Sequence, residues 1–137
     1  WEDGDPIDES TQVILVEEPE EMGLWYRVAP LTFLGSSLKS NYKGCDPYIP
    51  ASLGSAIIYG PNIGRHTDSY SRLAASGAAR IIKDVQGLTQ AVENLLAADQ
   101  SALMAHAAWV TISDGAEATD AVIEDIQMHL DTLESMR

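Results

Sequence analysis

The chain has 137 residues, of which 45% are hydrophobic and 21% charged, and these proportions are those of one soluble globular domain. They exclude a chain that is disordered throughout and a collagen, and the single cysteine, Cys45, excludes a disulfide scaffold. The net charge of −13 argues against nucleic acid as a bulk partner, so we expect none.

The apolar patterns predict strands that alternate with helices along the chain. The expected strands are residues 11–17, 31–35, 55–60 and 78–84. The expected helices are residues 19–29, 47–53, a segment from the 61–64 turn to about Ala75, 86–98, 99–112, and a last amphipathic helix after Asp114-Gly115. This alternation predicts an α/β fold, a Rossmann-like parallel sheet with helices on both faces.

The two ends of the chain differ from its middle in charge. Residues 1–26 hold nine acids and no Lys or Arg, residues 27–83 hold seven bases and two acids, and residues 84–137 hold ten acids and one base. An anionic ligand would therefore prefer the middle segment. The alternative is chance scatter over a solvated surface.

Composition also predicts how the chain is divided into a linker and a domain. Residues 1–10 are acidic with Gly and Pro, so we expect a linker there, and we expect residues 11–137 to form one domain. The first residue is Trp1 and no signal peptide is visible. We therefore expect the chain to be a piece of a longer polypeptide.

In an open parallel sheet, ligands bind beyond the carboxyl ends of the strands. The loop of residues 35–47 follows such a strand. Gly35 lets the backbone turn and approach a ligand closely, and Ser36 and Ser37 add hydroxyl groups. The turn that begins at Gly60-Pro61 follows the next strand and could supply backbone donors at the same edge.

Positive charge and a helix start complete this candidate phosphate site. Lys39 and Lys43 lie in the loop, and Asp46-Pro47 opens a helix whose free N–H groups and dipole suit a phosphate. Arg65 lies near the same edge. The alternative is an ordinary surface loop in which Asp46 is a plain helix cap.

The remaining reactive side chains suggest no further chemistry. We expect His66 on the surface near the strand ends, His106 at a packed helix position and His129 on the acidic last helix, with no spacing that would bind a metal. Cys45 has no nearby His, so we expect an inert thiol. The sequence contains no G-x-S-x-G, P-loop or G-x-G-x-x-G motif, and we expect no cofactor, metal or catalytic residue in this chain.

Four stretches occur in an order and spacing that indicate a family: EMGLWY (21–26), FLGSSL (33–38), GCDPYIPASLG (44–54) and the Gly60-Pro61 pair. Together they resemble the C-terminal half of bacterial 3-deoxy-D-manno-octulosonic acid (Kdo) transferases. The likeness covers about residues 11–112.

The resemblance implies a GT-B glycosyltransferase, in which two Rossmann-like domains face a cleft. The C-terminal domain of such enzymes binds the sugar nucleotide CMP-Kdo, and the enzyme transfers Kdo to the lipid A precursor in lipopolysaccharide biosynthesis. This occurs at the cytoplasmic face of the bacterial inner membrane. The membrane anchor and the catalytic Glu of the family lie in the other half, so the resemblance implies a fragment that is itself soluble and inactive alone.

The resemblance also assigns residues to a sugar-nucleotide site. These are Glu21, Gly35, Ser36, Ser37, Lys43, Gly44, Cys45, Asp46, Ile49, Gly60 and Pro61. Ser36 replaces the second of two family glycines, Cys45-Asp46 replaces a His-Asn pair, and Ile49 replaces a Glu that would hold the ribose hydroxyls. Losing such charge-assisted bonds costs about 1.5–3 kcal/mol each. A second hypothesis is therefore a non-catalytic domain that kept the fold, lost nucleotide binding and serves as a scaffold or partner surface.

Overall fold

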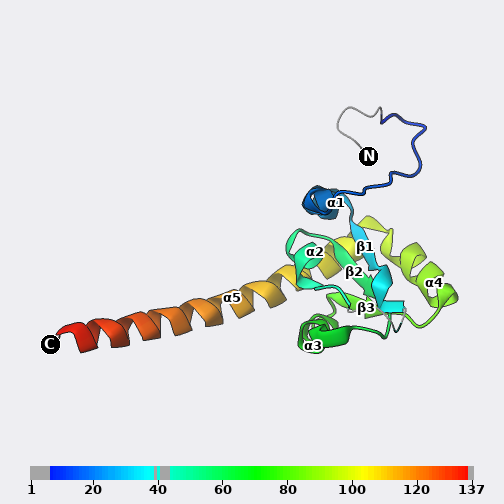
Figure 1. The fold of residues 1–137 in the computed structure, drawn as a ribbon. Helices are drawn as coiled ribbons and strands as arrows, with labels where there is room; N and C mark the ends of the chain where they lie inside the picture. The colour runs from blue at the N-terminus through cyan, green and yellow to red at the C-terminus, as the bar shows by residue number, and fades with distance from the viewer. Residues whose placement is uncertain (1–6, 39, 41–43, 136–137) are drawn as a thin grey trace.

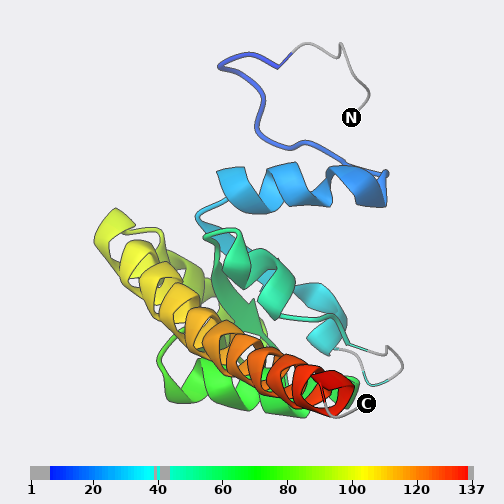
Figure 2. The ribbon, with the colours of Figure 1, turned by 90° about the vertical axis from the view of Figure 1, so that its left-hand side faces the viewer.

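The computed structural model describes residues 7–38, 40 and 44–135, apart from the side chains of Glu117, Glu134 and Ser135. Figures 1 and 2 show an α/β body, an N-terminal segment to one side of it, and a long helix that extends away from it. Within the described residues the sheet has three parallel strands in the order β1-β2-β3. They are β1 (Leu31–Leu34), β2 (Ala56–Tyr59) and β3 (Ala79–Ile81).

Helices connect and cover these strands. A 3₁₀ turn (Pro19–Glu21) leads into α1 (Met22–Val28), and the others are α2 (Tyr48–Ser52), α3 (Thr67–Ala75), α4 (Val85–Leu95) and α5 (Ala98–Ser135). α1 ends just before Pro30, which cannot continue a helix. Asp84 caps the start of α4, because its carboxylate accepts a 2.7 Å hydrogen bond from the Gly87 N–H.

One core lies on the face of the sheet covered by α2, α3 and α5. Ile57 and Tyr59 of β2 point into it, where they meet Tyr70 and Leu73 of α3 and Ala108 of α5. The rings of Tyr59 and Tyr70 lie 4.5 Å apart between centroids. The central strand therefore packs on this face against both α3 and α5.

A second core lies on the opposite face, beneath α4. Ile58 of β2 points to this side and packs with Ala91 and Leu95 of α4. All four residues of β2 are buried, as expected for the central strand of a parallel sheet covered on both sides. The predicted α/β class and the predicted helices on both faces are confirmed.

Two predictions about elements are wrong. Residues 11–17 form no strand; Val13 is 86% exposed and Leu15 70% exposed. β propensity specifies a strand only where a neighbouring strand and a packed face are present. The predicted break at Asp114-Gly115 is also absent, because α5 runs through it without interruption. A single glycine costs a helix only about 1 kcal/mol relative to alanine.

No helix among the described residues is both long enough and apolar enough to cross a membrane.

Candidate functional site

The loops that follow β1 and β2 are fastened to each other at the carboxyl edge of the sheet. The fully buried Ser37 lies in the 3₁₀ turn Gly35–Leu38, and its hydroxyl donates to the carbonyl of Leu34. The same hydroxyl oxygen accepts a 2.6 Å hydrogen bond from the N–H of Gly60. The Asn62 N–H donates to the Ser37 carbonyl at 2.8 Å. These contacts place residues 35–38 beside residues 60–62.

Gly60 has no space for a side chain at this junction. A Cβ built on Gly60 would lie 2.6 Å from the Ser37 carbonyl oxygen and 2.9 Å from Cδ2 of Leu38. The glycine is therefore required for the two loops to approach each other, which gives its place in the sequence a physical reason.

A third loop joins the same edge. Gly44 has a positive φ of 72°, and a Cβ on it would lie 2.7 Å from the carbonyl oxygen of Ile63. On the outer side, the Ser36 hydroxyl lies 3.2 Å from the Cys45 sulfur. The stretches 35–38, 44–47 and 60–64 therefore converge on one rim, which we call the three-loop rim.

Tyr70 supports this rim from below. Its hydroxyl donates a 3.0 Å hydrogen bond to the carbonyl of Cys45, while its ring packs in the core. Burial, and after it the negative charges of Cys45 and Asp46, raise the pKa of Tyr70 well above its usual value. Tyr70 therefore stays a neutral donor and fixes the backbone of the third loop.

The start of α2 offers few donors. The Tyr48 N–H donates a 3.0 Å hydrogen bond to the Asp46 carboxylate, and Pro47 and Pro50 have no N–H. The Ile49 N–H is therefore the one first-turn donor that remains. The Ile49 side chain is 55% exposed.

The described site residues differ in how accessible they are. Gly35, Cys45, Ile49 and Pro61 are exposed at the rim, Ser36, Gly44 and Asp46 are half-buried, and Ser37 and Gly60 are buried. The predicted Lys39 and Lys43 lie outside the described residues. Ser37 thus uses its hydroxyl inside the protein and does not present it at the surface.

Two further side chains belong to the 3₁₀ turn and α1, and of these Tyr26 lies near the rim. Glu21 precedes α1; its Oε2 atom is shielded from solvent and has no hydrogen-bond partner among the described residues. Tyr26 of α1 lies close enough to Cys45 that burial, and then the charge of Cys45, raise the pKa of its phenol.

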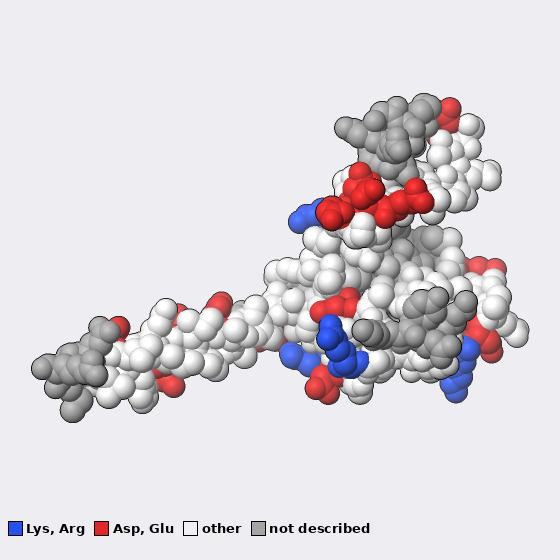
Figure 3. Space-filling model, viewed as in Figure 1, with Lys and Arg blue, Asp and Glu red and all other residues white. Residues whose placement is uncertain are grey.

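The charges are separated over the surface as well as along the sequence. Figure 3 shows acidic side chains gathered beside the N-terminal segment, whereas most of the visible basic ones lie around the body that carries the sheet. Arg65, which follows the 60–64 turn, is exposed.

Sequence reasoning missed Tyr70 as a residue of the rim. The only available signal was a tyrosine on an apolar helix face, because a buried phenol normally finds a hydrogen-bond partner. Its partner, Cys45, is 25 residues away, and the fold alone brings the two together.

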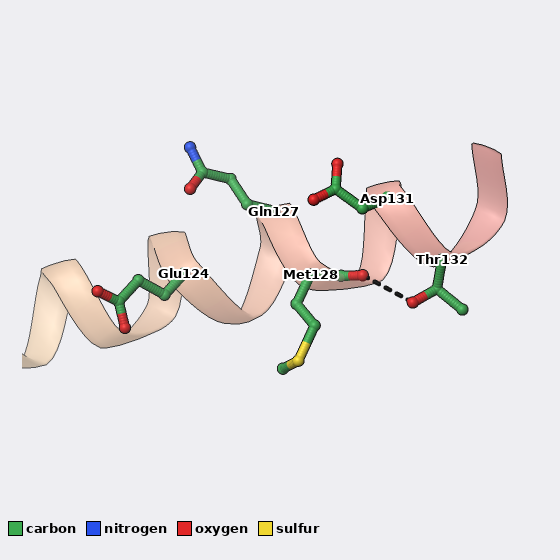
Figure 4. Close-up of a pocket in the computed structure, with 5 residues that line it drawn as sticks. All are labelled: Glu124, Gln127, Met128, Asp131 and Thr132. Atoms are coloured by element: carbon green, nitrogen blue, oxygen red, sulfur yellow. Dashed lines mark hydrogen bonds between the residues drawn. The ribbon is translucent and has the colours of Figure 1, made fainter. Parts of the chain in front are cut away.

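The histidines and the hollow on α5 add no second site. His66 is half-buried near the rim and His129 is exposed; His106 is exposed with its ring stacked near Trp109, so its predicted packed position is wrong. The described residues contain no group of three or more His, Cys, Asp or Glu side chains placed to hold a metal. The hollow in Figure 4 is lined by five residues of α5 alone, so it has no opposing wall.

Comparisons with known proteins give one consistent result. The chain is similar to the 3-deoxy-D-manno-octulosonic acid transferase of Rickettsia typhi, with 30% identity over 92 residues, which is 67% of this chain and 20% of the relative. The protein of the same name from Rickettsia prowazekii is 29% identical over 92 residues, again 67% of this chain and 20% of the relative. That from Rickettsia bellii is 33% identical over 82 residues, 60% of this chain and 19% of the relative.

The chain spans about one fifth of the length of these relatives. No family model and no solved structure matches it. The sequence matches name the same family as the resemblance described above. The chain is thus a relative of the 3-deoxy-D-manno-octulosonic acid transferases, and the match is consistent with their C-terminal domain.

Proposed function

We propose that this chain is the sugar-nucleotide-binding domain of a Kdo transferase, and that CMP-Kdo binds at the three-loop rim. The observation that carries the proposal is the convergence of residues 35–38, 44–47 and 60–64 at the carboxyl edge of a parallel sheet. That edge is where open α/β sheets bind their ligands. The similarity to proteins named Kdo transferases supports the same ligand class.

The parts of the rim would have different roles toward the nucleotide. Gly35 and Ser36 would let the backbone and one hydroxyl approach the phosphate, and Lys43 would supply positive charge. Ser37 and Gly60 would hold the two loops at a fixed separation. Such preorganisation improves binding because less freedom is lost when the ligand arrives.

In the proposed enzyme this domain contributes positioning and electrostatic stabilisation of the leaving cytidylate. The acceptor would be a lipid A precursor at the cytoplasmic face of the inner membrane, and membrane contact would come through a further domain of a GT-B enzyme. No candidate general base for the acceptor has been identified in this chain. We therefore expect that the 137-residue chain does not catalyse transfer on its own.

A specific observation favours a second candidate function. The exposed Ile49 offers no acceptor for ribose hydroxyls, and the Asp46 carboxylate places a negative charge where a phosphate would bind. A domain with these residues could keep the fold and serve as a non-catalytic scaffold.

Calorimetric titration of the chain with CMP and with CMP-Kdo tests the proposal. We expect saturable heat with the wild-type chain, and no heat at millimolar ligand would contradict the first function. Ile49→Glu restores a ribose acceptor, and Leu103→Glu adds the same charge to an exposed site on α5 as the matched control. If only Ile49→Glu binds and the wild-type chain does not, the non-catalytic function is supported.

A further inference from the structure

Tyr70 reaches the three-loop rim from the core of the protein. The residue lies on α3 without exposed surface, and its ring packs against Tyr59 with 4.5 Å between the centroids. Its hydroxyl extends to the rim, where it donates a 3.0 Å hydrogen bond to the carbonyl of Cys45. Because a close-packed ring has few alternative positions, this hydroxyl holds the Cys45 carbonyl in one direction.

The bond to Tyr70 fixes the orientation of the peptide group that joins Cys45 to Asp46. No described peptide bond is cis, and in a trans peptide the C=O and the N–H point to opposite sides of the chain. The Cys45 carbonyl is directed toward the buried phenol, so the Asp46 N–H is directed away from the core. This N–H makes no hydrogen bond to a described residue, and it is therefore a donor that a ligand can use.

Two further contacts hold the same stretch of chain. Gly44 approaches Ile63 so closely that a Cβ on the glycine would lie 2.7 Å from the Ile63 carbonyl oxygen. The Ser36 hydroxyl lies 3.2 Å from the Cys45 sulfur. Residues 44–46 are therefore held by α3 and by both neighbouring loops. Freedom that the fold has already removed is not lost again on binding, so a donor held in this way binds a ligand more tightly.

A phosphate is the group of the proposed ligand that suits this donor. Backbone N–H groups form charge-assisted hydrogen bonds with anionic oxygens, which are stronger than bonds between neutral groups. The hydrogen bond that the Cys45 carbonyl accepts also polarises the peptide group, and this strengthens the Asp46 N–H as a donor. The Asp46 carboxylate opposes an anion, but its Oδ1 atom accepts the Tyr48 N–H at 3.0 Å and leaves the Asp46 N–H free.

We propose that Tyr70 is a positioning residue of the sugar-nucleotide site, and that it directs the Asp46 N–H toward the phosphate of the ligand. The inference rests on the proposed function, to which it adds a donor atom and the residue that orients this donor. Tyr70 does not touch the ligand in this arrangement, because it acts through the Cys45 carbonyl. Burial raises the pKa of Tyr70 well above its usual value, so the phenol keeps its proton at neutral pH.

Calorimetric titration of the 137-residue chain with CMP tests the role of Tyr70. We expect Tyr70→Phe to weaken CMP binding by about three- to tenfold, the equivalent of one neutral hydrogen bond. Tyr59→Phe is the matched control, because the Tyr59 hydroxyl bonds to no described residue. Ser55→Ala controls for lost stability, since the buried Ser55 hydroxyl donates to the Ala29 carbonyl at 2.7 Å, at the opposite end of β2. Unchanged affinity in Tyr70→Phe, or an equal loss in Ser55→Ala, would overturn the proposal.

The donor atom has its own test. In amide NMR spectra, the Asp46 proton signal should move downfield when CMP is added but not when cytidine, which lacks the phosphate, is added. Asp46→Asn should tighten CMP binding several-fold, because an amide oxygen still accepts the Tyr48 N–H while the negative charge is gone. If CMP binds and the Asp46 signal does not move, the positioning role is wrong and the proposed function stands. If neither the wild-type chain nor Asp46→Asn binds CMP, the proposed function fails and this inference fails with it.

Discussion

The buried hydroxyl of Ser37 accepts a 2.6 Å hydrogen bond from the backbone N–H of Gly60, so one side chain joins the loops that follow two adjacent strands. The same hydroxyl donates to the Leu34 carbonyl. The hydroxyl thus acts both as a hydrogen-bond donor and as an acceptor inside the protein. The rim of the candidate site is therefore assembled by the fold before any ligand binds.

Ser37→Ala should destabilise the chain by about 1–3 kcal/mol, because the Gly60 N–H and the Leu34 carbonyl each lose a hydrogen-bond partner in a buried setting. Urea unfolding followed by circular dichroism measures the change. Ser36→Ala is the control, since Ser36 is half-buried and its hydroxyl contacts the Cys45 sulfur as its one partner among the described residues. Equal losses of stability in the two variants would show that Ser37 does not join the loops.

Gly44→Ala should cost more than Gly54→Ala, although both glycines have positive φ, 72° and 94°. Alanine at either position is strained by about 1–2 kcal/mol. At Gly44 its Cβ would also meet the Ile63 carbonyl oxygen at 2.7 Å, whereas nothing lies within 4 Å at Gly54. We expect a further loss of roughly 1–3 kcal/mol at Gly44. Unfolding free energies that agree for the two variants would contradict the close approach of the third loop.

Tyr70→Phe should remove about 0.5–1.5 kcal/mol of stability at neutral pH through loss of the bond to Cys45. The variant should also change the alkaline limb of the stability profile. Because burial raises the pKa of Tyr70 above its usual 10.0, the folded state holds this proton more tightly than the unfolded state. The contribution of Tyr70 to the free energy of unfolding is therefore fully present below about pH 10, and it decreases as the pH rises above that value.

The unfolding free energy of the wild-type chain should then decline more steeply above about pH 10 than that of Tyr70→Phe. Tyr59 and Tyr26, whose pKa values are also raised by burial, retain part of the decline in the variant. Parallel profiles for the two proteins would show that Tyr70 titrates normally in the folded state.

Asp84→Ala should destabilise α4 by about 1 kcal/mol, because the first-turn N–H of Gly87 loses its carboxylate cap. Asp114→Ala removes the same charge from an exposed position inside α5 and serves as the control. Thermal unfolding distinguishes them, since only the cap variant should show a clear fall in the midpoint temperature.

The alternation of strands and helices between residues 31 and 95 could be predicted because local patterns determine it. Each strand there is a short apolar run, and Pro30 or Gly54 separates neighbouring elements. The same reasoning failed for residues 11–17, since an apolar run becomes a strand only when another strand is available to pair with it. It also failed at Gly115, where the guanidinium of Arg72 lies near the glycine and the helix continues.

The location of the candidate site could be predicted from the sequence, but the contacts that hold its loops together could not. The carboxyl ends of β1 and β2 follow from the pattern, so the positions of Gly35 and Gly60 were predictable. The inward turn of Ser37 was not, because its acceptor role depends on Gly60, 23 residues further along the chain. Only the packed fold shows that this hydroxyl is a support for the loops.

The order of the strands in the sheet has a consequence for how the chain folds. Each strand pairs with the next one in sequence, so the sheet can grow by one βα unit at a time. Pairings between nearby segments lose little loop entropy, which favours rapid collapse. A ribosome that releases residues 31–60 would already have exposed β1, β2 and both residues of the Ser37–Gly60 junction, so this junction can form during synthesis.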